Sequence, residues 1–559
     1  MTVKKSLWKL IHPFLLLVLT LAVLIPLFTK QLLYTDDGEL HAARIANYYL
    51  AFKQGQIPPR LAPNLDSGYG SPVFNFVYPL PYIIGTLIYM ILPTTIVFSL
   101  NLTVILLTII GVSGAYYLAR QFLDEQPAAL TALIYLSTPY TLINIFSRTA
   151  LGEIAFFAVI PWVMWSAENF IRYKKVTLFN QLAFIFALTL LVLSHQTSII
   201  TTLPILIGYY LIRIKNQKKI IALIKQIIPS LATALLLTTW YWLPALWEKQ
   251  YIILDRADTI TNYLTQFPTT WPFFFQKVKN LDRFDTYKMV TLGYSSWIIF
   301  LSGLILIKTK NTANKKIIIY LLSAISFTVI LMMPFTRPLW MRSGLGNYVQ
   351  YPWRLLSVVT ISSLLLLIHL LQTKQFKKNY WLSGALIIAS GLSIMTYAQP
   401  RGFQDWSDYE LFEYFKTTTT FNEFQTIWSA KYTRQYPPDK ISFRAPDQKL
   451  YENNMMQPAE FTQLETKSWQ GSKMVYQVET DQPVEVIQKT YFFPGWELYV
   501  DHKKQLINYQ DEEFPGHIIY GLEPGKHQIN TKFTQHTPAR KIGLIAFFIG
   551  IISILVMLL

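Results

Sequence analysis

Long apolar stretches separated by short polar loops run along most of the chain. Each has about the length that a helix needs to cross the hydrocarbon core of a bilayer, roughly 17–25 residues. The pattern therefore predicts a polytopic α-helical membrane protein with about 12 transmembrane helices. The predicted spans are residues 10–30, 95–118, 127–145, 153–171, 178–194, 197–213, 224–245, 290–307, 317–334, 353–372, 380–398 and 541–559.

Positively charged side chains are concentrated in a few of the loops. The formal net charge is +17, although 52% of the residues are hydrophobic and only 14% are charged. Short loops that hold bases and no acids are typical of the cytoplasmic side of a membrane protein. We therefore place these loops and both chain ends in the cytoplasm and expect no nucleic-acid partner. The bases are Lys4, Lys5, Lys9, Arg172, Lys174, Lys175, Arg213, Lys215, Lys218, Lys219, Lys308, Lys310, Lys315, Lys316, Lys374, Lys377 and Lys378.

The apolar stretch from Pro79 to Leu92 does not fit this alternation. It is shorter than the spans, and Pro79 and Pro81 stand at its beginning. If it crossed the bilayer, the basic loops and the N-terminus could not all lie on one side. We therefore expect a re-entrant or surface-lying helix here, within a long first external loop of residues 31–94.

A hydrophilic insert separates the last two predicted spans and shares the external side with the first loop. In its second half, apolar and polar residues alternate as they do in half-buried strands, and Glu523–Lys526 reads as a hairpin turn. We therefore expect a small β-sandwich. The strand-like stretches are residues 473–478, 484–487, 496–501 and 527–530. The chain then divides into a transmembrane domain (1–398), an external domain (399–540) and a final transmembrane helix (541–559).

The first external loop begins with ionisable residues directly after the first span, where lipid ends and water begins. Asp36 and Glu39 have the spacing of a capping box, and Gly55 can end a helix. We therefore predict a helix over residues 36–54 that lies on the membrane. Charged groups at this depth are costly, so they usually serve a purpose.

One face of this predicted helix carries chemically active side chains. Asp37, His41, Arg44 and Tyr48 recur at positions that helical periodicity brings together. This face is a candidate site for chemistry at the membrane surface. The simpler alternative is that Asp36 only caps the helix and that the other charges form a solvated face.

Several short motifs are spread over nearly the whole chain. They are Asp37–Arg44, Gly55–Arg60, Asn64–Leu65, Gly68–Phe76, Ser147–Glu153, Ser194–Gln196, Tyr351–Leu356 and Tyr491–Asp501. Together they resemble motifs of the YfhO-like membrane proteins, a family also labelled 6-pyruvoyl-tetrahydropterin synthase-related. The label does not imply pterin chemistry, because the 8 histidines are scattered and lack the paired spacing of zinc ligands.

The resemblance implies the GT-C class of integral-membrane glycosyltransferases. In that class the first external loop carries an essential Asp or Glu, the donor is a polyprenyl-phosphate sugar, and anomeric configuration is usually inverted. Asp37 matches the acidic position and is the implied catalytic base, with Asp36 as the second choice. The implied acceptor is a cell-envelope glycan or teichoic acid, on the extracytoplasmic face of a bacterial cytoplasmic membrane.

Sugar transfer of this kind needs a base for the acceptor hydroxyl and cations near the leaving phosphate. Arginines at the external edges of the predicted spans are candidate cations, namely Arg148, Arg337, Arg342 and Arg354. Arg354 begins a helix close after Tyr351, where the helix N-terminus adds affinity for anions. The alternative for each arginine is a side chain that only snorkels to the interface.

Other candidates for contact with donor or acceptor lie in the first loop and beside later spans. They are Glu39, His41, Arg44, Glu153, His195 and Tyr351. Glu153 begins a helix, so it could equally do no more than complement the helix dipole. His195 lies between two predicted spans, where it could orient a substrate or be a structural histidine.

The implied chemistry requires no cofactor. Asp36, Asp37 and Glu39 could together hold a divalent cation weakly, yet members of the class often work without one. The chain has no cysteine, so disulfides and thiolate metal sites are excluded.

Two other functions fit a chain of this kind. One is a transporter or flippase of lipid-linked sugars, and the other is a non-enzymatic envelope assembly or binding protein. The predicted spans carry little charge through their middles, so a polar transport path is not evident. Replacing Asp37 by Asn separates these functions, because an enzyme would lose turnover whereas a binding protein would be nearly indifferent.

Overall fold

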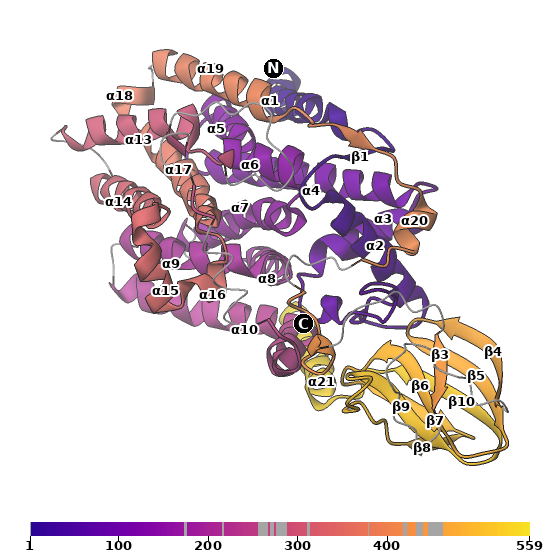
Figure 1. The fold of residues 1–559 in the computed structure, drawn as a ribbon. Coiled ribbons are helices and arrows are strands. Elements are labelled where there is room, and N and C mark those ends of the chain that lie inside the picture. The colour runs from indigo at the N-terminus through magenta and orange to yellow at the C-terminus, as the bar shows by residue number, and fades with distance from the viewer. Residues whose placement is uncertain are drawn as a thin grey trace.

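A computed structural model describes residues 2–172, 176–214, 217–254, 266–268, 273–274, 288–309, 314–377, 380–416, 422–431, 440–444 and 462–559. The helices form one packed body, and most of the strands gather in a separate region at one end of it (Figure 1). Some of the bases that we place in the cytoplasm lie outside the described residues, namely Lys174, Lys175, Lys215, Lys310 and Lys378.

Every predicted span overlaps a helix. These helices are α1 (Thr2–Val23), α4 (Ile96–Arg120), α5 (Glu125–Ser137), α7 (Leu151–Arg172), α8 (Leu178–Val192), α9 (Gln196–Arg213), α10 (Gln217–Glu248), α13 (Gly293–Ile307), α14 (Lys315–Leu331), α17 (Leu356–Leu371), α19 (Tyr380–Tyr397) and α21 (Pro538–Leu558). Within the described residues, 6 helices are long and apolar enough to cross a membrane, or up to 8 if two bent pairs each form one span. A helical membrane-type fold is thus confirmed, whereas the count of about 12 crossings stays a prediction.

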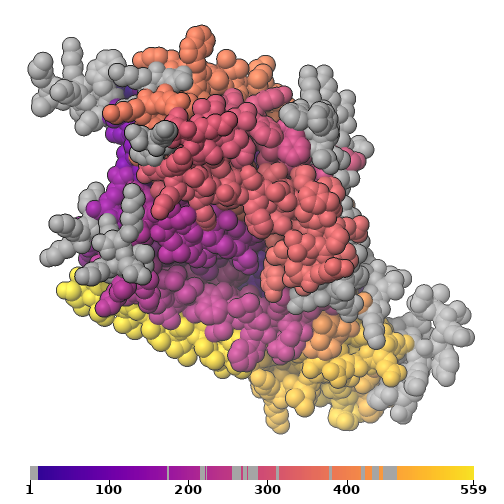
Figure 2. All heavy atoms as spheres, turned by 90° about the vertical axis from the view of Figure 1, so that its left-hand side faces the viewer, coloured from indigo at the N-terminus to yellow at the C-terminus, as the bar shows by residue number. Residues whose placement is uncertain are grey.

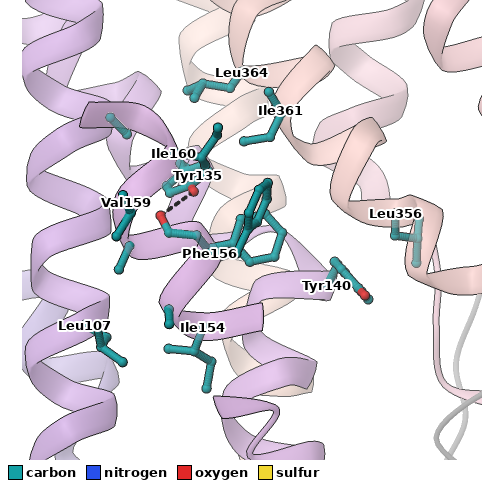
Figure 3. Close-up of a cluster of buried hydrophobic side chains, with 14 of the residues drawn as sticks. Leu107, Tyr135, Tyr140, Ile154, Phe156, Val159, Ile160, Leu356, Ile361 and Leu364 are labelled. Atoms are coloured by element: carbon teal, nitrogen blue, oxygen red, sulfur yellow. Dashed lines mark hydrogen bonds between the residues drawn. The ribbon is translucent and has the colours of Figure 1, made fainter. Parts of the chain in front are cut away.

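The centre of the helical body is formed by α7 and α17, whose apolar stretches are 83% and 94% buried, whereas α21 is only 11% buried. Figure 3 shows side chains gathered between these central helices, among them Phe156, Ile160, Ile361 and Leu364. Tyr135 of α5 closes the cluster by donating a hydrogen bond to the Phe157 carbonyl at 2.7 Å. Within a bilayer such packing gains van der Waals contact, because lipid tails are as apolar as these side chains.

The first external loop folds back onto the helical body. After α1 the chain forms β1 (Leu32–Leu33), which pairs antiparallel with β2 (Phe403–Gln404) at the start of the insert. The helix α2 (Gly38–Lys53) follows and packs against α4 and against α3 (Leu80–Ile91). The predicted helices at 36–54 and 79–92 are thus present, and the short α3 lies against protein on one side.

The predicted capping box at the start of α2 is wrong. Asp37 occupies the N-cap position, and its side chain accepts no capping hydrogen bond. The Gly38 N–H instead donates to the Thr35 hydroxyl at 3.1 Å. Asp36 is unavailable as a cap because its carboxylate pairs with Arg401 at 3.1 Å.

The C-terminal region contains two antiparallel sheets. One has the order β4-β5-β10-β7-β8 and the other β3-β6-β9. Their strands are β3 (Ile441–Arg444), β4 (Thr462–Gln470), β5 (Lys473–Thr480), β6 (Val484–Tyr491), β7 (Trp496–Val500), β8 (Lys503–Gln505), β9 (His517–Leu522) and β10 (Gly525–Phe533). Alternate residues such as Tyr476, Val486, Leu498 and Ile529 share one buried core between the sheets. A β-rich region is thus confirmed, whereas its sandwich geometry stays a prediction.

The turn at Glu523–Lys526 does not form the predicted hairpin. It follows β9, which pairs with β6, and it leads into β10, which pairs with β5 and β7. The turn therefore connects the two sheets. A turn motif reports only a local reversal of the chain, and the partner of the next strand depends on the whole fold.

Candidate functional site

The acidic motif of the first loop is joined to the connection that precedes α7. The Asp37 N–H donates to the Arg148 carbonyl at 2.9 Å. Next to it, the hydroxyls of Thr35 and Thr149 are 2.9 Å apart. Thr149 adopts the left-handed conformation (φ 51°, ψ 46°), which is rare for a β-branched residue. This turn ends the π-helix Asn144–Arg148 and lets the chain enter α7 beside the motif.

The carboxylate of Asp37 faces positively charged groups. It is partly exposed, and no residue that the structure describes donates a hydrogen bond to it. Burial raises the pKa of Asp37 to about 6, although the charges of Arg148, Arg44 and Arg354 lower it, and the Asp36 charge raises it further. A carboxyl group with this pKa is mostly ionised at neutral pH and can accept a proton from a substrate.

Glu153 forms ion pairs with two arginines of the site, Arg148 and Arg354. Its Oε1 is 2.8 Å from Arg148 Nη1 and 3.6 Å from Arg354 Nε. The Tyr140 hydroxyl donates to Oε2, and Asn144 Nδ2 lies 3.3 Å from that atom. Glu153 does lie in the first turn of α7, as predicted, but it also anchors two cations. Buried and fully partnered, it is a poor candidate for direct contact with a substrate.

The segment around Tyr351 interleaves aromatic rings and guanidinium groups. The ring centroids of Tyr351 and Trp353 are 5.1 Å apart and nearly parallel. The Arg148 guanidinium carbon lies 4.5 Å from the Trp353 ring centroid, and that of Arg354 lies 5.1 Å from the Tyr351 ring centroid. Cation–π contacts of this kind restrict where the guanidinium groups point.

His41 and Arg44 meet on the inner side of α2. Arg44 Nη1 donates to the Tyr82 hydroxyl at 3.1 Å, and His41 Nδ1 lies 2.9 Å from the same oxygen. The Tyr82 oxygen accepts from Arg44 and shares a second hydrogen bond with His41, whose direction depends on the tautomer of the ring. Burial lowers the pKa of His41 well below its usual value, which agrees with a neutral ring. Tyr78 stacks on Tyr82 and extends this cluster toward Asp37.

His195 has the geometry of a structural histidine. It is the N-cap of α9, where its Nδ1 accepts from the Ser198 N–H at 3.4 Å. Its ring packs edge-on against Tyr78, with the centroids 5.6 Å apart. Burial lowers the pKa of His195 to about 3, so the ring is neutral at physiological pH.

Two of the predicted arginines lie away from this cluster. Arg337 and Arg342 belong to the short helix α15 (Arg337–Ser343), and both side chains are exposed. Neither makes an ion pair with any residue in the described ranges. Their neighbours Leu339 and Met341 are also exposed, so α15 has the composition of a segment at the interface.

The three carboxylates of the first loop do not converge on a common point. Asp36 pairs with Arg401, Asp37 faces the arginines, and Glu39 accepts from the Tyr414 hydroxyl at 3.3 Å. Among the residues that the structure describes, no group of three or more His, Asp or Glu side chains is arranged to hold a metal ion. The weak divalent site does not fit this arrangement.

Sequence reasoning missed several members of the site. Arg401 lies just beyond the predicted span 380–398. Arg354 was selected as an arginine at the external edge of a span, and the same criterion would have selected Arg401. No sequence pattern marked Tyr140 and Asn144 as members of the site, because their contacts depend on the π-helical segment that ends at Arg148. Tyr82 was predicted only as part of an apolar helix.

Comparison with curated proteins gives a distant relative. The chain is 24% identical over 330 residues to an uncharacterized protein of Lactococcus lactis subsp. cremoris (strain MG1363), a match covering 57% of this chain and 52% of that protein. The chain therefore spans about half the length of this curated relative.

Several solved structures are remotely similar in fold. Arabinofuranosyltransferase AftD from Mycobacteria is 14% identical with a TM-score of 0.43, over 71% of this chain and 27% of that one. The Archaeoglobus fulgidus oligosaccharyltransferase is 13% identical with a TM-score of 0.42, over 72% and 57%. ArnT from Cupriavidus metallidurans, bound to undecaprenyl phosphate, is 12% identical with a TM-score of 0.29, over 62% and 77%.

The family match covers most of the helical region. Residues 74–401 match the family described as "6-pyruvoyl-tetrahydropterin synthase related domain; membrane protein". This stretch includes Arg148, Glu153, His195 and Arg354. It amounts to more than half of the chain, and the protein therefore belongs to the 6-pyruvoyl-tetrahydropterin synthase related family of membrane proteins.

Proposed function

We propose that this protein is a membrane glycosyltransferase that moves a sugar from a polyprenyl-phosphate donor to a cell-envelope glycan on the extracytoplasmic face. Asp37 is the general base, and Arg148 and Arg354 bind the donor phosphate. The observation that carries the proposal is the Asp37 carboxylate, which is partly exposed and lies beside arginines from three separate segments. A topology of about 12 crossings with both ends cytoplasmic belongs to the same proposal.

The reaction is a displacement at the anomeric carbon C1 of the donor sugar. A hydroxyl oxygen of the acceptor forms the new bond to C1, and the bond between C1 and the phosphate oxygen breaks. The electron pair of that bond stays on the phosphate, so polyprenyl phosphate leaves. Asp37 accepts the hydroxyl proton, and attack from the side opposite the leaving group inverts the configuration at C1.

Arg148 and Arg354 are suited to the leaving phosphate. Each guanidinium has five N–H donors, so contact with Glu153 leaves donors for a phosphate. The pairing with Glu153 and the aromatic contacts fix both side chains before substrate binds. Cations that are already in place stabilise the charge developing on the phosphate without reorganisation.

The position of Asp37 in the chain supports a lipid-linked donor. Asp37 follows α1 after a connection of residues 24–36, and α1 is apolar toward its C-terminal end. The polyprenyl tail can therefore stay in the bilayer while the sugar and phosphate reach the base. A polar acceptor approaches from the aqueous side, where the insert and the β-rich region lie.

The test is the composition of envelope glycans in a strain that lacks the gene. Mass spectrometry compares the deletion strain with strains complemented by the wild type, D37N or D481N at equal membrane levels. Asp481 is an exposed aspartate between β5 and β6 and serves as the matched control. We expect one sugar substituent to disappear on deletion, to return with the wild type and D481N, and to stay absent with D37N. Restoration by D37N would reject the proposal.

A further inference from the structure

Residues 401–416, which we call the strap, lead from α19 into the insert and cross the first external loop. Strand β2 of the strap pairs with β1, and the Tyr414 hydroxyl donates to Glu39 at 3.3 Å. Asp408 Oδ1 accepts from the Ile96 N–H at 2.8 Å, at the start of α4. The strap is therefore attached to the first loop and to the helical body at several points along its length.

Arg401, at the beginning of the strap, reaches the acidic motif. Its Nη1 lies 3.1 Å from Asp36 Oδ1, and the two side chains are only 14% and 10% exposed. Arg401 Nη2 also lies 2.9 Å from the Met289 sulfur. Removing one partner of a buried ion pair leaves the other charge uncompensated, so each side chain depends on the other.

Asp36 and Asp37 are adjacent in sequence but have different surroundings. Asp36 pairs with the strap, whereas Asp37 faces the interior of the site. Charged and titratable groups on five segments act on Asp37. These segments are its own connection, α2, residues 78–82 at the start of α3, the turn before α7 and the segment before α17. The groups are Asp36, Arg44, Tyr78, Tyr82, Arg148, Tyr351 and Arg354.

We propose that Arg401 is a positioning residue for the base: by pairing with Asp36, it compensates the negative charge next to Asp37 and holds Asp36 away from the arginines. The inference rests on the proposed role of Asp37 as the base. It gives the strap a purpose in the reaction, because the strap delivers a cation to a carboxylate of the acidic motif.

The physical consequence is a change in the proton affinity of Asp37. The Asp36 charge raises the pKa of Asp37, and Arg401 opposes that charge at 3.1 Å. Without Arg401, less of the negative charge of Asp36 is compensated, so Asp37 keeps its proton to higher pH. In a partly hydrated site, a unit charge several ångströms from a carboxyl group shifts its pKa by roughly half to one pH unit.

The test measures protonation of Asp37 directly and needs no substrate. The intact protein in detergent is treated with a water-soluble carbodiimide and an amine at a series of pH values, because carbodiimides activate protonated carboxyl groups. Peptide mass spectrometry then gives the extent of modification at Asp37. We expect the midpoint for R401Q to lie roughly half to one pH unit above that of the wild type.

Control variants separate this effect from a general disturbance. R401K keeps the charge and should return the midpoint toward that of the wild type, and D36N/R401Q should bring it to the wild-type value or below. R444Q removes an arginine with a 12% exposed side chain from an ion pair of the β-rich region and should leave the midpoint unchanged. An unchanged midpoint in R401Q protein that elutes as a folded species would overturn the inference. Full envelope activity of D37N would instead reject the proposed function, so the two failures are distinguishable.

Discussion

The backbone N–H of Asp37 donates a hydrogen bond to the carbonyl oxygen of Arg148 at 2.9 Å. This bond joins the first external loop to the turn that precedes α7. It places the proposed base and a proposed phosphate ligand on neighbouring backbone segments. Catalytic groups held by the main chain lose little entropy when the substrate binds.

The rate of sugar transfer should depend on pH through Asp37. Its pKa is raised to about 6, chiefly by burial. Below that pH the carboxyl is protonated and cannot accept the hydroxyl proton, so kcat/KM should fall as the pH drops below about 6 and level off above it. Initial rates measured from pH 4.5 to 8.5 in membrane vesicles would check this. A value of kcat/KM that does not fall at acid pH would contradict the assignment of Asp37 as the base.

The D37N variant should also change stability in a defined direction. The folded-state pKa of about 6 lies above the ordinary value of 3.8, so folding favours the protonated form. The wild type should therefore lose more stability than D37N as pH rises through this window. Thermal unfolding in detergent at pH 4 and pH 7.5 compares the two proteins. Equal pH dependence in both would count against a buried, desolvated carboxylate.

Loss of the Glu153 charge should destabilise the helical body. Glu153 is buried and contacts Arg148 and Arg354, so E153Q leaves two guanidinium groups without their common counter-charge. Breaking a buried pair costs about 3–5 kcal/mol. Thermal unfolding should show a large loss for E153Q and a small one for E485Q, whose ion pair with Arg444 is more exposed. Similar losses for both would contradict the anchoring role of Glu153.

A methyl group at residue 152 should disturb the site. A Cβ on Gly152 would overlap the Tyr78 ring, which must then move away from its place beside Tyr82. We expect G152A to be destabilised by about 1–3 kcal/mol and to lose activity. G384A is the control, because a Cβ at Gly384 in α19 meets nothing within 4 Å. Wild-type activity in G152A would show that the Tyr78 ring position does not matter.

The exposed arginines of α15 should be dispensable for catalysis. Arg337 and Arg342 are exposed, and the structure does not bring them to Asp37. The R337Q/R342Q variant should therefore keep kcat within about twofold, whereas R148Q should lose much of its turnover. Transfer rates at equal membrane levels would decide. A large loss of kcat in R337Q/R342Q would show that these arginines take part in the reaction.

Local patterns predicted the elements of the fold well. Apolar stretches of sufficient length predicted the helices that later appeared, because each helix satisfies its own backbone groups in lipid. Alternation predicted β5, β6, β7 and β10 because successive side chains of a strand point to opposite faces, of which one is buried. The hairpin at Glu523–Lys526 failed because pairing between strands depends on distant residues.

The candidate site was only partly predictable. Helical spacing placed His41 and Arg44 on one face of α2, and both do meet Tyr82. The pair Arg401–Asp36 joins residues separated by 365 positions, which no local pattern can reveal. The capping prediction failed for the same reason, since the distant arginine takes the Asp36 carboxylate.

The most direct test of the account is the turnover of D37N with the donor identified from the envelope comparison. Single-turnover transfer is measured in membrane vesicles at pH 7.5, with wild type, D36N and D37N at equal levels and with donor binding measured in parallel. We expect D37N to bind the donor but to transfer sugar about 10²–10⁴-fold more slowly, with a smaller loss for D36N. A D37N rate within tenfold of the wild type would contradict the role of Asp37 as the base.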